Sequence, residues 1–286
     1  MTPPETALPP GTLDLHVHAA PDIKPRSVND LSLARACVDL GWQGAALKSH
    51  SEPTGGRAAM VGAATRAGMI GGLVLNRAIG GLNPRAIAAF ASATPDTARI
   101  VWMPTRDAAH DIARKGTGRA AVPVLDGSAP AEGLTEVLEA IARHDLVLAS
   151  GHLHPAETVA VFRLAKAAGG RRLLVTHATA PITDMGDDLL QECLELGAHV
   201  EICARNVFGD DRARIDPAKL GRAAEVFRLC GGRALLSSDL GDTRYPLPWE
   251  GLAQLAGALA GQGIPAADLR HALTEIPAHL VHQSTA

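Results

Sequence analysis

Short apolar runs alternate with Ala- and Leu-rich stretches of helical periodicity from one end of the 286-residue chain to the other. Such alternation is typical of repeated strand–helix units around a parallel sheet, whose strands are buried on both faces. Eight runs are expected to form strands: Thr12–Val17, Gly44–Lys48, Met69–Leu75, Arg99–Met103, Asp145–Ser150, Arg172–Thr176, Ala198–Cys203 and Ala234–Ser238. The stretches between and after them are expected to form helices: Val28–Leu40, Thr54–Ala67, Pro84–Ala91, Ala131–Arg143, Pro155–Ala168, Asp184–Leu196, Pro217–Leu229, Pro248–Ala260 and Pro265–His282.

Eight such units without a linker, a composition shift or a low-complexity segment favour one closed barrel over an open sheet with an added domain. We therefore predict an α/β fold, a single (β/α)8 barrel of the TIM type over residues 1–286. The least regular stretch is Thr105–Leu125, which is interrupted by Pro and Gly and contains an extra apolar run at Ala121–Leu125. This stretch is expected to form either a lid over the functional site or a short extra strand.

Charge and composition limit the partners. A formal charge of -3 with both signs interspersed provides no basic field for nucleic acid, and no run of about 18 apolar residues predicts a membrane span. Residues 1–11 lack the basic and apolar regions of a signal peptide. The four cysteines lack the paired spacings of zinc or redox motifs and fit reduced thiols in the cytoplasm: Cys37, Cys193, Cys203 and Cys230. A small molecule is the expected partner, and apolar stretches on outer helices fit subunit contacts in a homo-oligomer as well as they fit the core.

Polar residues gather where the expected strands end, which is where barrel enzymes carry their catalytic groups. Alternation along the first strand places His16 and His18 on one face and Leu13, Leu15 and Val17 on the other, toward the helices. Three later strands end in further candidate ligands: His152, His177 and Asp239. Imidazole and carboxylate groups that converge from several strands are the ligands of zinc sites. The sequence therefore predicts a divalent metal at the barrel mouth.

Lys48 ends the second expected strand inside the barrel, where burial of its charge lowers the pKa and makes the neutral amine available. Three interpretations stay open. Lys48 is carbamylated by carbon dioxide and bridges two metals, or it forms a Schiff base with substrate, or it pairs with a carboxylate such as Glu201 or Asp14.

Several other residues near strand ends are candidates for substrate contacts. His50 follows Lys48 and fits a substrate contact, a partner of a ligand or an alternative ligand. Any of four arginines could hold a carboxylate or phosphate: Arg77, Arg106, Arg205 and Arg244. Arg205 is the best of them, because it shares one face of the seventh strand with Glu201 and Cys203. Asn206 is expected to line the same rim.

These strand-end residues resemble the pattern of the amidohydrolase superfamily, a group of metal-dependent hydrolases on TIM barrels. The similar residues follow the order of that family's strands: His16 and His18 on strand one, His152 on strand five, His177 on strand six and Asp239 on strand eight. The segment Ile276–Leu280 is also similar to a helical segment that often follows strand eight there.

The sequence departs from the family pattern in two places. Strand four ends in Trp102-Met103-Pro104-Thr105, so the bridging lysine that many binuclear members carry there is missing, and Lys48 is only analogous to a strand-two arrangement. The few residues before the first strand are also too short for the β-sandwich of some members, which indicates a compact branch.

The resemblance implies two Zn²⁺ ions, with His16, His18 and Asp239 on one, His152 and His177 on the other, and carbamylated Lys48 between them. Asp239 is then the catalytic residue that accepts a proton from the attacking water. The expected reaction is hydrolysis of an amide, imide, lactone or related ester bond in a small anionic substrate.

Two other functions stay open from the sequence. A mononuclear metal site could perform deamination or non-oxidative decarboxylation, and measurement of the metal content separates it from the binuclear site. A non-catalytic, metal-stabilised barrel could bind a ligand, and a lack of activity on amide, ester and phosphoester substrates would favour it.

Overall fold

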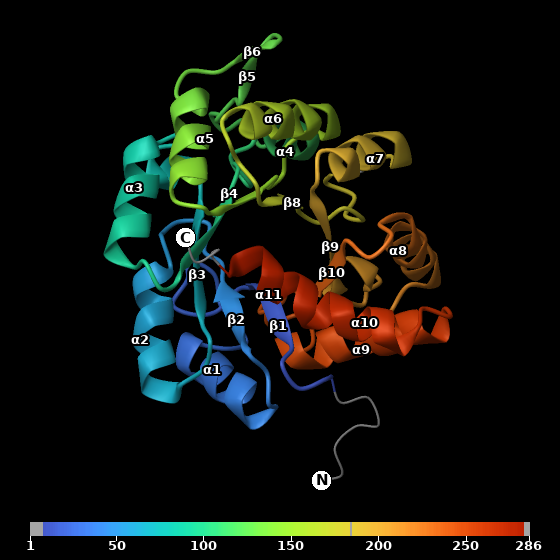
Figure 1. Cartoon of the computed structure of the whole chain (residues 1–286). Coiled ribbons are helices and arrows are strands. Elements are labelled where there is room, and N and C mark those ends of the chain that lie inside the picture. The colour runs from blue at the N-terminus through green and yellow to red at the C-terminus, as the bar shows by residue number, and fades with distance from the viewer. Residues whose placement is uncertain (1–7, 184, 283–286) are drawn as a thin grey trace.

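The computed structural model describes residues 8–183 and 185–282 and shows a barrel of eight parallel strands surrounded by helices (Figure 1). In barrel order the strands are β1 (Leu13–Val17), β2 (Gly44–Leu47), β3 (Ile70–Val74), β4 (Ala98–Trp102), β7 (Val147–Ala149), β8 (Leu173–Val175), β9 (His199–Cys203) and β10 (Ala234–Ser237). The barrel closes where Val17 pairs in parallel with Leu240, just after β10. Each of the eight expected strands is present, so the predicted fold is confirmed.

Helices follow the strands in the expected order: α1 (Asp30–Asp39), α2 (Gly55–Thr65), α3 (Pro84–Ala93), α5 (Leu134–Arg143), α6 (Pro155–Ala167), α7 (Asp187–Glu195), α8 (Pro217–Leu229), α9 (Pro248–Gly261), α10 (Ala266–Leu273) and α11 (Glu275–Val281). Two short 3-10 helices, η1 (Arg77–Ile79) and η2 (Ala204–Val207), follow β3 and β9. Helices α3 and α8 begin at Pro84 and Pro217, as expected. The preceding residues, Asn83 and Asp216, cap them by accepting hydrogen bonds from backbone N–H groups of the first turn. Residue 184, the expected start of α7, and residues 1–7 lie outside the described residues.

The structure corrects the prediction of one final helix over Pro265–His282. That stretch forms α10 and α11, which meet at Thr274. Pro277 explains the break, because its ring and missing N–H cannot continue a helix from Leu273, whereas the first turn of a new helix tolerates proline.

The irregular stretch before α5 contains a helix that periodicity did not predict. Helix α4 spans Ala109–Lys115, and the apolar run at Ala121–Leu125 ends in a small hairpin. Strand β5 (Leu125–Asp126) pairs there with β6 (Ala129–Pro130), and the hairpin stands away from the barrel in Figure 1. The expected extra strand is therefore present but two residues long, and the lid is not formed by it.

Two apolar clusters fill the molecule. The larger lies between strands and helices, whereas the smaller fills the barrel interior and includes residues of α11, which lies across the amino ends of the strands (Figure 1). Leu13 and Leu15 belong to the interior cluster, so their expected orientation toward the helices is wrong. A shift of register between Asp14 and Val17 adds one residue to β1. This bulge turns His16 inward after Leu15, and only Val17 packs outward as predicted.

The barrel interior leaves no room beside Trp102, which is fully buried. A Cβ atom added at Gly72 on β3 would lie 2.1 Å from Cζ3 of that indole ring. We expect Gly72→Ala to lower the free energy of unfolding by about 1–3 kcal/mol through overpacking, measured by chemical denaturation. The control is Gly56→Ala on α2, where a Cβ meets nothing within 4 Å and helix propensity predicts a gain of about 0.4–1 kcal/mol. Equal stability of the two variants would contradict this packing argument.

The helices of residues 8–183 and 185–282 include none with both the length and the apolar character needed to cross a lipid bilayer.

Candidate metal centre

A cavity of about 240 Å³ opens at the carboxyl ends of the strands. Its walls contain predicted site residues that follow seven different strands, together with three further cations and two apolar residues: His18, Lys24, Arg26, Lys48, His50, Arg106, Lys115, His152, His177, Ala180, Ile182, Arg205, Asn206 and Asp239. His16 lies just below this surface and is fully buried. Ten residues predicted separately from sequence thus gather at one place.

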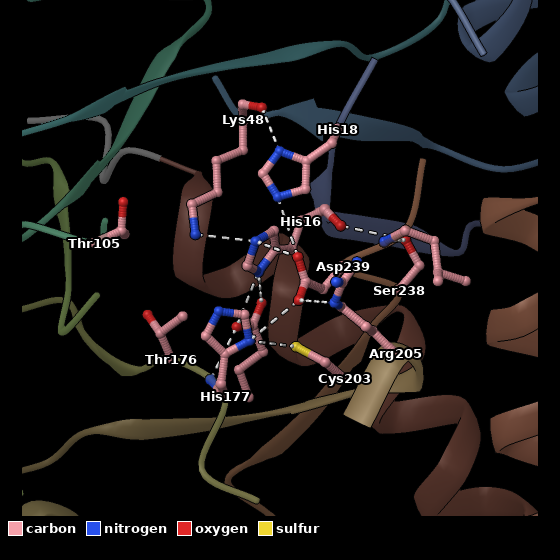
Figure 2. Close-up of polar contacts among 12 residues, drawn as sticks. His16, His18, Lys48, Thr105, Thr176, His177, Cys203, Arg205, Ser238 and Asp239 are labelled. Atoms are coloured by element: carbon pink, nitrogen blue, oxygen red, sulfur yellow. Dashed lines mark hydrogen bonds and ion pairs between the residues drawn. The ribbon is translucent and has the colours of Figure 1, made fainter. Parts of the chain in front are cut away.

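His16, His18 and Asp239 form the tightest group (Figure 2). Oδ1 of Asp239 lies 3.1 Å from Nε2 of His16 and 3.1 Å from Nε2 of His18. The group is held by the barrel seam, where the N–H of Asp239 donates to the carbonyl of His16 and the N–H of Ser238 donates to Asp14. The first and last strands therefore position the three side chains together.

Hydrogen bonds on the outer side of each ring fix which nitrogen faces the centre. Nδ1 of His18 lies 2.9 Å from the carbonyl oxygen of Lys48, and Nδ1 of His16 lies 3.1 Å from Oε1 of Glu201. Both partners are acceptors, so each Nδ1 carries a proton. Orientation by an acceptor on the far nitrogen is the arrangement that metal-ligating histidines use.

The contact between His18 and Asp239 tests whether a cation fits. Burial lowers the pKa of the His18 ring to about 3, so its Nε2 presents a lone pair to the carboxylate 3.1 Å away. Two acceptors at this distance repel each other unless a cation binds both. A divalent ion held by His16, His18 and Asp239 removes this conflict, and the donor set suits zinc.

Backbone conformation marks the same place. His177 has φ 51° and Asp239 has φ 50°, and they are two of only five non-glycine residues with positive φ among the described residues. This left-handed conformation costs free energy and is kept where the surroundings require it, often at functional sites. Thr183 supports the turn at His177 by donating its hydroxyl to that residue's carbonyl at 2.6 Å.

The second predicted ligand pair faces the first. The rings of His152 and His177 have centroids 5.3 Å apart, and the His177 ring is 4.9 Å from that of His16. Nδ1 of His152 lies 2.9 Å from Oδ1 of Asp111, which leaves its Nε2 for the cavity. His177 lies 3.5 Å from Oδ2 of Asp239 through Nδ1.

Sequence reasoning missed three residues of the centre. Glu201 and Cys203 form a second possible ligand group with His16 and His177, and all four are buried. The sequence placed both on one strand face with Arg205 and named Glu201 as a possible partner of Lys48, but neither was predicted as a ligand, although alternation of polar residues on a buried strand could have identified them. Asp111 could not have been found in this way, because it lies on α4.

Lys48 does not pair with a carboxylate, so the structural ion pair with Glu201 or Asp14 is not observed among the described residues. Its Nζ lies 3.0 Å from Nε2 of His16 (Figure 2). The same atom lies 4.8 Å from the centre of the Trp102 ring. Asp14 accepts backbone N–H groups of the seam instead. Burial lowers the pKa of Lys48 to about 8, as the sequence predicts.

The acidic groups remain ionised despite burial. Burial alone would raise the pKa of Glu201, but His16, His177 and Lys48 outweigh it and hold the value at about 2. Burial also acts to raise the pKa of Asp239, but His16 and His177 outweigh it and hold that pKa well below its usual value. Burial next to Glu201 raises the pKa of the Cys203 thiol well above normal.

The predicted substrate residues line the cavity. His50 stacks on His18 with ring centroids 5.0 Å apart, and its Nδ1 lies 2.8 Å from the hydroxyl of Thr105. Arg205 lies over the Tyr245 ring at 4.6 Å, and its Nε is 3.8 Å from Oδ2 of Asp239.

The remaining candidates divide between the cavity and the outside. Nδ2 of Asn206 is buried without a hydrogen-bond partner among the described residues. Arg106 also lines the cavity, whereas Arg77 lines a separate depression and Arg244 pairs with Asp242 outside it. His154 is the N-cap of α6 and does not line the cavity.

Comparison with known proteins agrees with this architecture. The family described as "Family of unknown function (DUF6282)" matches residues 11–201, well over half of the chain. The chain belongs to this family. No curated protein shows significant sequence similarity to it.

Among the solved structures similar to this family member are two that are hydrolases by their titles. An amidohydrolase from Burkholderia multivorans is 13% identical with a TM-score of 0.61, and 94% of this chain and 98% of that one are covered. A mutant of an organophosphorus hydrolase from Deinococcus radiodurans is 17% identical with a TM-score of 0.57, over 96% of this chain and 94% of that one. At these identities the likeness shows a shared fold.

Proposed function

We propose that this protein is a metal-dependent hydrolase that cleaves an amide, imide, lactone or related ester bond of a small anionic substrate. One observation carries the proposal: His16, His18 and Asp239 converge, and the far nitrogen of each ring is fixed by an acceptor. The similar structures from Burkholderia multivorans and Deinococcus radiodurans are titled amidohydrolase and organophosphorus hydrolase, which supports the reaction type.

The residues that would hold metal are those that surround the convergence point. His16, His18 and Asp239 would bind one divalent ion, and His152 and His177 would bind a second, with a carbamate on Lys48 between the ions. The carbamate forms when the neutral amine of Lys48 adds to carbon dioxide and releases one proton. Zinc is the proposed metal, because imidazole and carboxylate ligands suit it.

Asp239 is the proposed catalytic residue. A divalent ion, when bound, lowers the pKa of a water molecule toward neutrality and polarises the carbonyl or phosphoryl oxygen of the substrate. Asp239 is ionised and lines the cavity, so it can accept the proton of the attacking water and return it to the leaving group. Arg205 and Asn206 on one wall and His50 on another are placed to orient the substrate.

A single-metal site is the second candidate, because both possible ligand groups contain His16. One ion on His16, His18, His177 and Asp239 would suit deamination or non-oxidative decarboxylation. The metal content of purified protein tests both proposals. About two ions per chain, with hydrolysis of amide, lactone or phosphoester substrates, supports the first, and one ion with an unmodified Lys48 overturns it.

Glu201 provides a separate test of the metal centre, because it contacts the proposed ligand His16 at Nδ1, the ring nitrogen that faces away from the centre. We expect Glu201→Gln to weaken zinc affinity by roughly 10–100-fold, since the amide no longer accepts as a charged group and His16 loses its orientation. Titration with a competing chelator measures this. Glu192→Gln, an exposed change on α7, is the control and should leave the affinity unchanged. Wild-type affinity in Glu201→Gln would count against His16 as a ligand.

A further inference from the structure

The cavity walls carry more positive charge than the proposed chemistry uses. Asp239 is the one carboxylate among the described lining residues. Six lining side chains are cationic: Lys24, Arg26, Lys48, Arg106, Lys115 and Arg205. Three of the six are neutralised. Arg26 pairs with Asp22 at 2.6 Å and Lys115 pairs with Asp111 at 2.7 Å, while Arg205 lies near Asp239.

Arg106 has no such partner. It follows β4, is half-buried, and its guanidinium forms no hydrogen bond or ion pair with any described residue. Burial together with the charges of Arg26 and Arg119 lowers its pKa, and Asp22, the carboxylate that opposes this shift most, is already bonded to Arg26. A half-buried, unpaired guanidinium is costly unless an anion binds it.

Lys24 converges on Arg106 from the loop after β1. Its ammonium has no partner among the residues that the structure describes, and the charge of Arg106 is the largest cause of its lowered pKa. Two unpaired cations that repel each other at the rim of a cavity form the complement of an oxyanion, which a guanidinium can hold through two parallel hydrogen bonds.

The position of this pair in the barrel separates it from Arg205. In the strand order, β4 stands three places from β9, so Arg106 and Arg205 approach the cavity from different walls. The imidazoles and Asp239 line the same cavity, and Figure 2 shows Arg205 beside Asp239. An anionic group held by Arg106 would therefore lie on a different wall of the cavity from Arg205.

We infer that Arg106 and Lys24 form a second anion subsite, which binds a carboxylate or phosphate group of the substrate on the wall away from Arg205. That the bound group belongs to a substrate rests on the proposed function, but anion binding at this subsite does not depend on hydrolysis. It restricts the substrate to a small molecule with an oxyanion beside the scissile bond. The cavity of about 240 Å³, below the roughly 300–1,000 Å³ of common ligand pockets, sets the size.

Titration calorimetry with inorganic phosphate and, in a second arm, acetate tests the subsite on metal-free protein at low ionic strength. Wild-type protein is expected to bind at least one of the two anions. Arg106→Gln is expected to weaken that binding at least about tenfold, as loss of a charged bidentate contact does. Binding of phosphate alone identifies a phosphate group, and binding of acetate as well identifies a carboxylate as sufficient.

The matched control is Arg77→Gln, which removes an arginine that also follows a strand end but lines another depression. The subsite is overturned if wild-type protein binds neither anion, or if Arg77→Gln weakens binding as much as Arg106→Gln does. Thermal melting confirms that each variant is folded. Because no metal or turnover is involved, anion binding without any hydrolytic activity would keep this subsite and reject only the proposed function.

Discussion

Asp239→Asn is expected to reduce kcat of the zinc-loaded protein by roughly 10²–10⁴-fold on any substrate that it hydrolyses, because the amide cannot accept the proton of the attacking water. The loss should appear in kcat more than in KM, since the side chain acts on the reacting atoms and the anion-binding arginines are unchanged. Steady-state kinetics on the best lactone, amide or phosphoester found in a panel measures this effect.

The control for that variant is Asp187→Asn in the first turn of α7. Asp187 pairs with Arg222 outside the cavity, so its loss should leave kcat within a small factor of the wild-type value. Metal content of Asp239→Asn must be measured in parallel, because this residue is also a proposed ligand. Wild-type kcat in Asp239→Asn would remove it from the mechanism.

Lys48→Met is expected to reduce the bound zinc from about two ions to about one per chain, because methionine cannot form a carbamate bridge. Folding should survive, since methionine fills a similar volume against Trp102 and replacement of a buried charge by an apolar group is often neutral or stabilising. Metal analysis and intact mass in bicarbonate buffer give the readout. The exposed change Lys166→Met on α6 is the control.

The outcome for Lys48 also separates the remaining interpretations. Two ions in Lys48→Met would show that the bridge, if any, comes from another residue, and Glu201 is the nearest alternative. Covalent trapping of substrate on wild-type Lys48 by borohydride would instead identify a Schiff base.

The sequence predicts the barrel well because parallel strands buried on both faces leave a strong apolar signal, and each expected strand is present. The metal candidates were predictable for a related reason. Once the strands are known, His16, His152, His177 and Asp239 must meet, because all parallel strands end at one face.

What the sequence could not predict depends on contacts between distant segments. Strict alternation of side chains along a strand cannot predict the bulge in β1. Because of this bulge, Leu15 and His16 both point inward. Helix α4 is too short for a clear periodicity, so Asp111 behind His152 was missed. The partner of Lys48 also depends on where the rings of His16 and Trp102 lie, which no spacing rule gives.

The seam between β1 and β10 joins the proposed ligands His18 and Asp239, which are 221 positions apart in the chain. The site is therefore complete only where the first and last strands of the barrel pair. Any ion bound to both side chains would also link the first and last strands of the barrel. By mass action, zinc at 100 times its dissociation constant would raise the free energy of unfolding by about 2.7 kcal/mol, which makes thermal stability a readout of occupancy even before a substrate is known.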